Sequence, residues 1–243
     1  MSSSFTLTQS TLDILNNFAE IHEQVTLRPG LEQRTCNGIR SFIADVTLDA
    51  EIPQQCAIYD LNRILGVIKT VKNLPTLEFS EQALTVVHDY GRVTIPYAHP
   101  ELVTKVPQHK FFVQDQFASF DLPATLWNTI KNQARVLDCN SLQIIINEHG
   151  DFTLRLVNDK DKAADAFASA VFNAPNTTVA ANEPNTWAVN FDVLKFLPGN
   201  YKVEVGNLAS KASGGTLFGA IFTLDDPNKK VTYLTSGTVV KSR

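Results

Sequence analysis

Several common signatures of catalysis are missing from the sequence. It has no glycine-rich phosphate loop, no G-x-S-x-G nucleophile motif, no C-x-x-C pair and no H-E-x-x-H zinc motif. Its five histidines are separated along the chain from one another and from the cysteines. A catalytic Cys–His pair would require the fold to bring such residues together, because geometry decides whether a base can act. We therefore expect no enzymatic activity, no catalytic residue, no metal site and no cofactor.

Long apolar runs and paired cysteines are also lacking. No apolar run approaches the ~20 residues that a membrane helix needs, so no membrane partner is expected. The first ten residues, MSSSFTLTQS, have neither the basic region nor the apolar region of a secretory signal. Cys36, Cys56 and Cys139 are odd in number and widely spaced, which favours reduced thiols in a cytosolic compartment over disulfides or a metal site.

The composition is sufficient for a packed core. The 243 residues are 44% hydrophobic and 19% charged, which argues against disorder and fits one large domain or two domains of ordinary size. The formal net charge is -4, so any attraction to nucleic acid must come from a local basic face rather than from the overall charge.

Residues 56 to 71, with the sequence CAIYDLNRILGVIKTV, form the clearest structural pattern. Residues 56 to 59 are a short apolar run typical of a strand, and Asp60 offers an N-cap carboxylate. Apolar residues then recur at helical spacing, which predicts an amphipathic helix. The opposite face of that helix contains no carboxylate and collects Asn62, Arg63, Gly66, Thr70 and Asn73, with Lys69 at its edge.

The second half of the chain repeats this organisation. A helix is expected to begin at Asp121 and Pro123, which supply an acidic cap and a proline in the first turn. Residues 57 to 66 and 188 to 197 share a strand–aspartate–helix layout with little identity, and the second copy predicts a short helix over residues 192 to 197. The outer face of the longer helix gathers Asn128, Lys131, Asn132 and Arg135. We therefore expect an internal duplication of an α+β unit.

The boundary between the two halves is marked by prolines. Pro96, Pro100 and Pro107 indicate an extended crossing segment. We assign residues 1–97 to the first domain, residues 98–115 to a linker region and residues 116–243 to the second domain. Residues 163 to 172 fit a helix by their alanines or a strand by their position between turns.

Three segments carry a resemblance to a known family. They are LNNFAEI at residues 15 to 21, AIYDLNRILGV at residues 57 to 67 and PGNYK at residues 198 to 202. In order and approximate position they resemble the sliding clamp of T-even-type tailed bacteriophages, the processivity factor of their DNA polymerase. The A-I-Y-D-L-N-x-x-L-G segment is the most specific of the three, and the matching segments fall in both halves.

The resemblance implies the DNA-clamp fold, with two similar α+β domains in each chain. It implies a homotrimeric ring whose helices line the lumen and whose antiparallel sheets form the outside. It further implies that the chain encircles duplex DNA without sequence preference, tethers the phage DNA polymerase and is loaded by an ATP-driven clamp loader. A role in late transcription and a location in the cytoplasm of the infected bacterial host also follow from the resemblance.

The resemblance and the basic helix faces together predict a DNA-facing set of residues. Its members are Arg63, Lys69, Lys72, Asn128, Lys131, Asn132, Arg135 and Lys195. Lysine and arginine contacts to phosphates are long-range and sequence-blind, as sliding requires. A helix expected over residues 8 to 22 departs from this pattern, because Asp13 and Glu20 share its outer face with Asn16 and Asn17. Either that helix is rotated or the lumen is weakly charged there.

Two other functions are compatible with the residues alone. One is a non-enzymatic structural module of duplicated α+β units that binds another protein and makes no DNA contact. The other is an enzyme whose site is assembled from residues distant in sequence, which a buried His or Cys with a strongly perturbed pKa in a pocket would support. The resemblance also implies that an apolar tail of the polymerase docks in a pocket beneath the linker, where Val103, Val106, Phe111 and Phe112 are candidate contacts.

Overall fold

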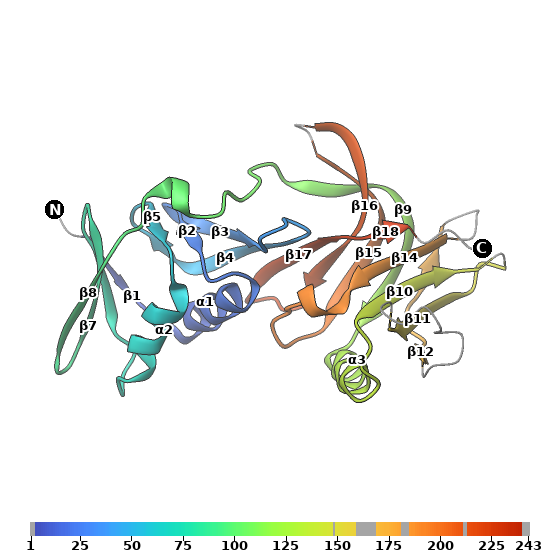
Figure 1. The fold of residues 1–243 in the computed structure, drawn as a ribbon, viewed down its shortest axis with the longest axis horizontal. Helices are drawn as coiled ribbons and strands as arrows, with labels where there is room; N and C mark the ends of the chain where they lie inside the picture. The colour runs from blue at the N-terminus through green and yellow to red at the C-terminus, as the bar shows by residue number, and fades with distance from the viewer. Residues whose placement is uncertain (1–2, 148, 159–168, 181–184, 211–212, 240–243) are drawn as a thin grey trace. The chain divides into compact units, whose positions relative to one another are not determined.

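The computed structural model describes residues 3–147, 149–158, 169–180, 185–210 and 213–239 (Figure 1). The chain divides into two compact units. Unit 1 extends to Pro107 and also includes Lys195–Leu197 and Asn228–Val231. Unit 2 contains the described residues of Gln108–Leu194, Pro198–Pro227 and the segment that begins at Thr232.

Unit 1 combines antiparallel strands with two adjacent helices. Its four-stranded sheet has the order β1-β6-β7-β8, formed by Ser3–Thr6, Thr76–Phe79, Ala83–His88 and Gly91–Pro96. Two further antiparallel pairs are β3 (Gly30–Cys36) with β4 (Phe42–Ile52) and β2 (Val25–Leu27) with β5 (Cys56–Ile58). Helices α1 (Gln9–Ile21) and α2 (Leu61–Lys69) lie side by side (Figure 1), and a 3-10 turn, η1, spans Pro100–Leu102.

Unit 2 has two antiparallel sheets and one long helix. The first sheet has the order β12-β11-β10-β14-β18, formed by Ala170–Phe172, Phe152–Val157, Ser141–Ile146, Asn185–Asn190 and Thr238–Val239. Five strands of the second follow in the order β13-β9-β15-β16-β17, formed by Thr178–Val179, Phe111–Leu122, Tyr201–Ser210, Ser213–Leu224 and Lys230–Ser236. The first two residues of β17 belong to unit 1. Helix α3 spans Ala124–Val136, and a 3-10 turn, η3, spans Phe191–Val193.

Each unit has an aromatic and aliphatic core. Phe18, Phe42 and Phe79 are fully buried in unit 1, and Trp187, Tyr201 and Tyr233 are fully buried in unit 2. Residues of this size dominate the burial of apolar surface, so each unit has its own source of hydrophobic stabilisation.

The strand–aspartate–helix prediction at residues 56 to 69 is confirmed. Strand β5 ends at Ile58, and Asp60 caps α2 by accepting a hydrogen bond from the backbone N–H of Arg63 at 3.0 Å. Leu61, Ile64, Leu65 and Ile68 are the buried residues of the helix, as their spacing predicts.

Two expectations for the second half are wrong. Asp121 does not begin a helix, because it lies in β9; α3 begins at Ala124, whose N–H donates to Asn200 Oδ1 at 2.9 Å. No helix spans residues 192 to 197, where only the single 3-10 turn η3 forms. Of the ambiguous segment, residues 170–172 form strand β12, and residues 163–168 lie outside the described residues.

Candidate nucleic-acid interface

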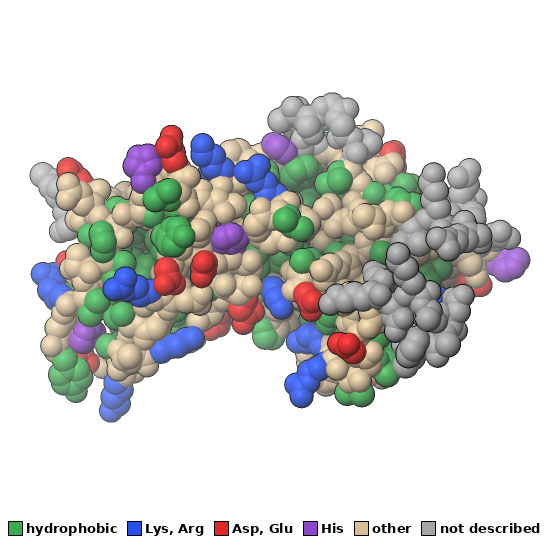
Figure 2. Space-filling model, in the orientation of Figure 1, with side chains coloured by type: hydrophobic (Ala, Val, Ile, Leu, Met, Phe, Trp, Pro, Cys, Tyr) green, Lys and Arg blue, Asp and Glu red, His purple; other side chains and the backbone are tan. Residues whose placement is uncertain are grey.

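Helix α2 exposes one basic, carboxylate-free face. Its buried residues occupy the opposite side, so Asn62, Arg63, Gly66 and Lys69 are exposed to solvent. An alanine Cβ built at Gly66 would meet no atom within 4 Å, which leaves the helix backbone open to close approach. Figure 2 shows lysine and arginine side chains over the region of α2, with acidic side chains beside them that belong to neighbouring segments, since α2 itself contains none.

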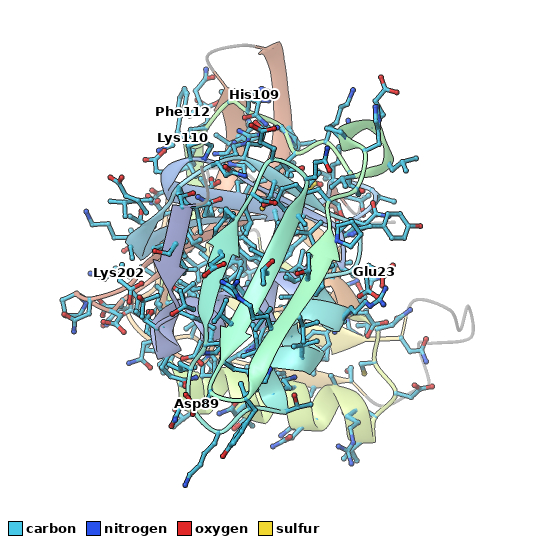
Figure 3. All side chains as sticks on the ribbon, turned by 90° about the vertical axis from the view of Figure 1, so that its left-hand side faces the viewer. Glu23, Asp89, His109, Lys110, Phe112 and Lys202 are labelled. Carbon is cyan, nitrogen blue, oxygen red and sulfur yellow. The ribbon has the colours of Figure 1, made fainter. Side chains whose placement is uncertain are left out.

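The loop after α2 is fixed to the neighbouring hairpin. Asn73 Nδ2 donates to Asp89 Oδ2 at 2.8 Å, at the tip of the β7–β8 hairpin, where Figure 3 labels Asp89. Lys72 precedes Asn73 and is exposed. The hydrogen bond therefore holds the backbone that carries Lys72, although Lys72 lies beyond the helix.

Helix α3 presents a second face of the same kind. Trp127, Ile130 and Ala134 are buried, and the Nζ of Lys131 lies 6.0 Å from the Trp127 ring centroid, at the outer limit of a cation–π contact. The helix contains no acidic residue. Its predicted DNA-facing residues are all exposed, namely Asn128, Lys131, Asn132 and Arg135.

Helix α1 differs from α2 and α3 in its charge. Asn17 is not on the outer face, because it is 3% exposed and its Nδ2 donates to the backbone oxygen of Lys195 at 3.0 Å. Asp13 Oδ2 lies 3.7 Å from Lys229 Nζ. Lys195 is exposed but belongs to unit 1 and follows η3, so its expected position on a short helix is wrong.

The segment between the predicted domains is attached to unit 1. The backbone N–H of Ala98 donates to the oxygen of Ala57 at 2.9 Å. Val103 is 3% exposed, and the N–H and hydroxyl of Thr104 donate to Gln24 Oε1 at 3.2 and 3.1 Å. Residues of the predicted linker region from position 111 onward form the start of β9.

The candidate contacts for a polymerase tail divide by exposure. Val103 is a core residue, whereas Phe112 is 44% exposed. The rings of His109 and Phe111 make an edge-to-face contact at 4.8 Å between centroids, and Figure 3 shows His109, Lys110 and Phe112 close together. Only Phe112 among these therefore offers a large exposed apolar side chain.

The described residues provide little for catalysis. Burial raises the pKa of the Cys56 thiol to about 12, and burial also raises the pKa of Cys36 and Cys139. A raised pKa lowers the fraction of reactive thiolate. In the described ranges no group of three or more His, Cys, Asp or Glu residues is placed to hold a metal ion. No helix in the same ranges has the length and apolar character to cross a membrane.

Three curated relatives match the chain, and each is named a sliding clamp. The protein of Vibrio phage KVP40 is 30% identical over 139 residues, which cover 56% of this chain and 62% of that protein. The protein of Enterobacteria phage T4 is 26% identical over 202 residues, covering 81% of this chain and 85% of that one. The protein of Escherichia phage RB69 is 24% identical over 212 residues, covering 85% and 90%. No family model matches the chain.

Solved structures match along the whole chain. The A. fulgidus PCNA, solved with the C-terminal region of FEN-1 bound, has a TM-score of 0.64 at 15% identity and covers 100% of this chain and 99% of that one. The PCNA of Entamoeba histolytica has a TM-score of 0.63 at 10% identity and covers 98% of both chains. At these identities the likeness concerns the fold alone, and it confirms the predicted DNA-clamp fold with its helices and antiparallel sheets.

Proposed function

Because this chain is a relative of the phage sliding clamps, we propose that it encircles duplex DNA and tethers a replicative DNA polymerase for processive synthesis. The observation that carries the proposal is the pair of exposed helix faces on α2 and α3. Each face is basic, carries amide side chains and has no carboxylate among its helical residues, in a chain whose net charge is -4.

The chemistry of these faces suits a ligand that must slide. Lysine and arginine attract phosphates without reading base sequence, and their interactions weaken with salt. Exposed asparagine side chains such as Asn62 and Asn132 can contact phosphates through water, which leaves the DNA mobile. The acidic balance of the whole chain repels DNA elsewhere, so attraction concentrates where the basic faces lie. Arg63, Lys69, Lys72, Asn128, Lys131, Asn132, Arg135 and Lys195 are the proposed DNA-facing residues.

The proposal includes a homotrimeric ring. Closing such a ring requires free strand edges on each copy, since unpaired edges template strand addition. In the described part of the chain, β8 pairs only with β7 and β12 pairs only with β11. Val171 on β12 is 60% exposed, and Tyr90, directly before β8, is 89% exposed. These features favour β8 and β12 as the edges that meet between copies.

Further partners belong to the same proposal. The ring would be opened by an ATP-driven clamp loader, would bind the phage DNA polymerase, and would serve as a platform for late transcription in the cytoplasm of the infected bacterium. It would act without chemistry or a cofactor of its own, as a non-enzymatic tether. The buried cysteine thiols, with pKa values raised by burial, give no support to the enzyme alternative.

Topological retention distinguishes a clamp from a module that makes no DNA contact. The protein is loaded by its cognate loader and ATP onto nicked circular DNA, and half of the sample is then linearised. A clamp survives high salt on the circle and is lost from the ends of the linear DNA. Equal loss from both, with an active loader confirmed on a known substrate, would contradict the proposal.

A triple variant tests the proposed DNA-facing residues. Arg63→Gln, Lys131→Gln and Arg135→Gln together should weaken binding to short duplex DNA. The slope of log affinity against log salt concentration should fall in magnitude by up to about one for each charge removed. The variant should keep its fold, because all three side chains are exposed. Unchanged affinity in the triple variant would favour the protein-binding module.

A further inference from the structure

Helix α1 carries the wrong charge for a helix beside DNA. It contains Asp13 and Glu20 and no basic residue, whereas its neighbour α2 contains Arg63 and Lys69 and no acidic residue. The two helices lie side by side in unit 1 (Figure 1). Uncompensated carboxylates on α1 would repel the phosphates that α2 attracts.

A lysine from the second half of the sequence is paired with the first of these carboxylates. Lys229 Nζ lies 3.7 Å from Asp13 Oδ2, and the two side chains are 33% and 40% exposed. Asp13 Oδ1 also accepts a hydrogen bond from Gln9 Nε2 at 2.8 Å. Opposite charges this close together largely offset each other's attraction or repulsion of a more distant charge.

A second lysine is held at the middle of α1 by a buried amide. Asn17, which is 3% exposed, donates from Nδ2 to the backbone oxygen of Lys195 at 3.0 Å. Residue 196 strengthens this attachment, because the rings of Phe196 and Phe42 lie 5.8 Å apart in the core of unit 1. Asn17 lies between Asp13 and Glu20 along the helix, and Lys195 itself is exposed, so the contact attaches the backbone of an exposed lysine to α1.

We propose that Lys229 and Lys195 supply the positive charge that α1 lacks, so that α1 becomes a DNA-compatible part of the interface. Lys229 cancels Asp13, and Asn17 is the positioning residue for Lys195. This inference rests on the proposed function and adds Lys229, Asp13 and Asn17 to it. Of the features expected on the outer face of α1, Asn17 faces inward instead. In this proposal the acidic side chains that remain outside are compensated by lysines from elsewhere in the chain.

Neutralising each member of the Lys229–Asp13 pair tests the proposal. Affinity for a short linear duplex is measured at low salt for the wild type, Lys229→Gln, Asp13→Asn and the double variant. Lys229→Gln should bind about fivefold more weakly and Asp13→Asn correspondingly more tightly, the scale of one exposed charge interaction. The double variant should return to within about twofold of the wild type, because it restores the wild-type charge at that position.

Matched control variants lie on the exposed face of strand β15 in unit 2. Lys202 and Glu204 are exposed on β15, and they alternate with Tyr201, Val203 and Val205, which are buried (Figure 3 labels Lys202). In the proposed ring the sheets form the outside, so Lys202→Gln and Glu204→Gln make the same charge changes on a surface that does not face DNA. Each should therefore alter the affinity by less than about twofold.

The outcomes separate the two proposals. Equal effects of Lys229→Gln and Lys202→Gln, or no gain from Asp13→Asn, would overturn the role of α1 while wild-type retention on circular DNA still supports a clamp. Loss of wild-type retention would overturn both. Thermal unfolding of each variant identifies any loss of affinity that comes from misfolding. Lys195→Gln is an independent test, because it removes the charge and leaves the contact of Asn17 with the backbone of residue 195 intact. Its loss of affinity should match that of Lys229→Gln.

Discussion

The guanidinium of Arg34 donates to both carboxylate oxygens of Asp45, its direct cross-strand neighbour on β4. Nε donates to Oδ1, and the second terminal nitrogen donates to Oδ2 at 2.8 Å. The other terminal nitrogen donates to the backbone oxygen of Pro107 at 2.6 Å. One planar side chain, 11% exposed, therefore joins β3, β4 and the end of the connecting segment.

Replacing Arg34 by Lys should loosen this end of the segment. A single ammonium cannot reproduce the three directed donors, so Asp45 and the Pro107 carbonyl would lose partners. We expect a loss of about 1–2 kcal/mol in the free energy of unfolding, less than for a fully buried pair because Asp45 is 35% exposed. Amide hydrogen exchange at residues 104–106 should accelerate in the same variant.

The ion pair between Arg92 and Glu78 is the matched control. Its distance is 2.6 Å, but its side chains are 61% and 29% exposed. Exposed pairs contribute little, so Arg92→Lys should change the free energy of unfolding by less than about 1 kcal/mol. Denaturant titration of both variants checks the difference, and an equal loss in the two would contradict the anchoring role of Arg34.

The N-terminus of α1 should make stability depend on pH through Asp49. Thr8 and Thr11 donate from their hydroxyls to the two carboxylate oxygens of Asp49 at 2.7 and 2.8 Å. Burial alone would raise the pKa of Asp49, but these hydrogen bonds, together with those from the backbone N–H groups of Asp49 and Ala50, outweigh burial and lower it. A folded-state pKa below the unfolded value stabilises the fold above the unfolded pKa, and this contribution is lost as pH falls through the folded pKa.

The variant Thr11→Val removes one of these donors at nearly constant volume. It should cost about 0.5–1 kcal/mol of unfolding free energy at neutral pH, because the exposed carboxylate is partly screened by solvent. The cost should shrink in acid, where the wild type also loses the charge on Asp49. Thermal unfolding from pH 7 down to acid measures the convergence; parallel curves at all pH values would refute this account.

The three cysteines should resist thiol reagents in the folded protein. All three are buried, and burial raises the pKa of the Cys56 thiol to about 12, so almost no thiolate exists at neutral pH. Labelling with a maleimide should be slow in native buffer and complete in denaturant. Rapid native labelling of Cys56, mapped by mass spectrometry, would show that the strand β5 opens readily.

The features that sequence predicted well are local ones. In α2, the cap, the apolar spacing and the basic face all come from residues within the helix or beside it, and Asp60 performs the predicted role. The outer face of α3 was also predicted correctly as exposed, because the 3.6-residue period fixes it once the helix exists. Exposure does not establish contact with DNA, so that part stays a prediction.

The features that sequence missed depend on residues far apart in the chain. Helix α3 begins at Ala124, directly after Pro123, which marked the start of the helix to within one residue. The acidic cap expected from Asp121 was wrong, because Asp121 lies in β9 and Asn200 supplies the acceptor for the N–H of Ala124. Lys195 does not lie on the predicted short helix. Its backbone carbonyl accepts a hydrogen bond from Asn17, and the next residue, Phe196, packs on Phe42. Neither contact has a local signal in the sequence.

Replacing a glycine by alanine should change the free energy of unfolding in opposite directions at Gly206 in β15 and at Gly66 in α2. At Gly206, where the register of β15 with β9 shifts, a Cβ would lie 2.0 Å from the backbone oxygen of Asp115. A backbone atom cannot move aside as a flexible side chain can, so Gly206→Ala should destabilise the fold by about 2–3 kcal/mol or more. Denaturant titration should show a lower midpoint, and an unchanged midpoint would contradict the close approach.

At Gly66 the same substitution should stabilise the protein. Glycine in the interior of an exposed helix costs roughly 0.5–1 kcal/mol relative to alanine, and a Cβ at this position would meet nothing within 4 Å. Gly66→Ala should therefore raise the free energy of unfolding by that amount. If α2 approaches DNA as proposed, the added methyl group should at the same time weaken binding to a short duplex, because it keeps phosphates away from the helix backbone between Arg63 and Lys69. A stabilised variant with unchanged affinity would place the DNA farther from α2 than the proposed function requires.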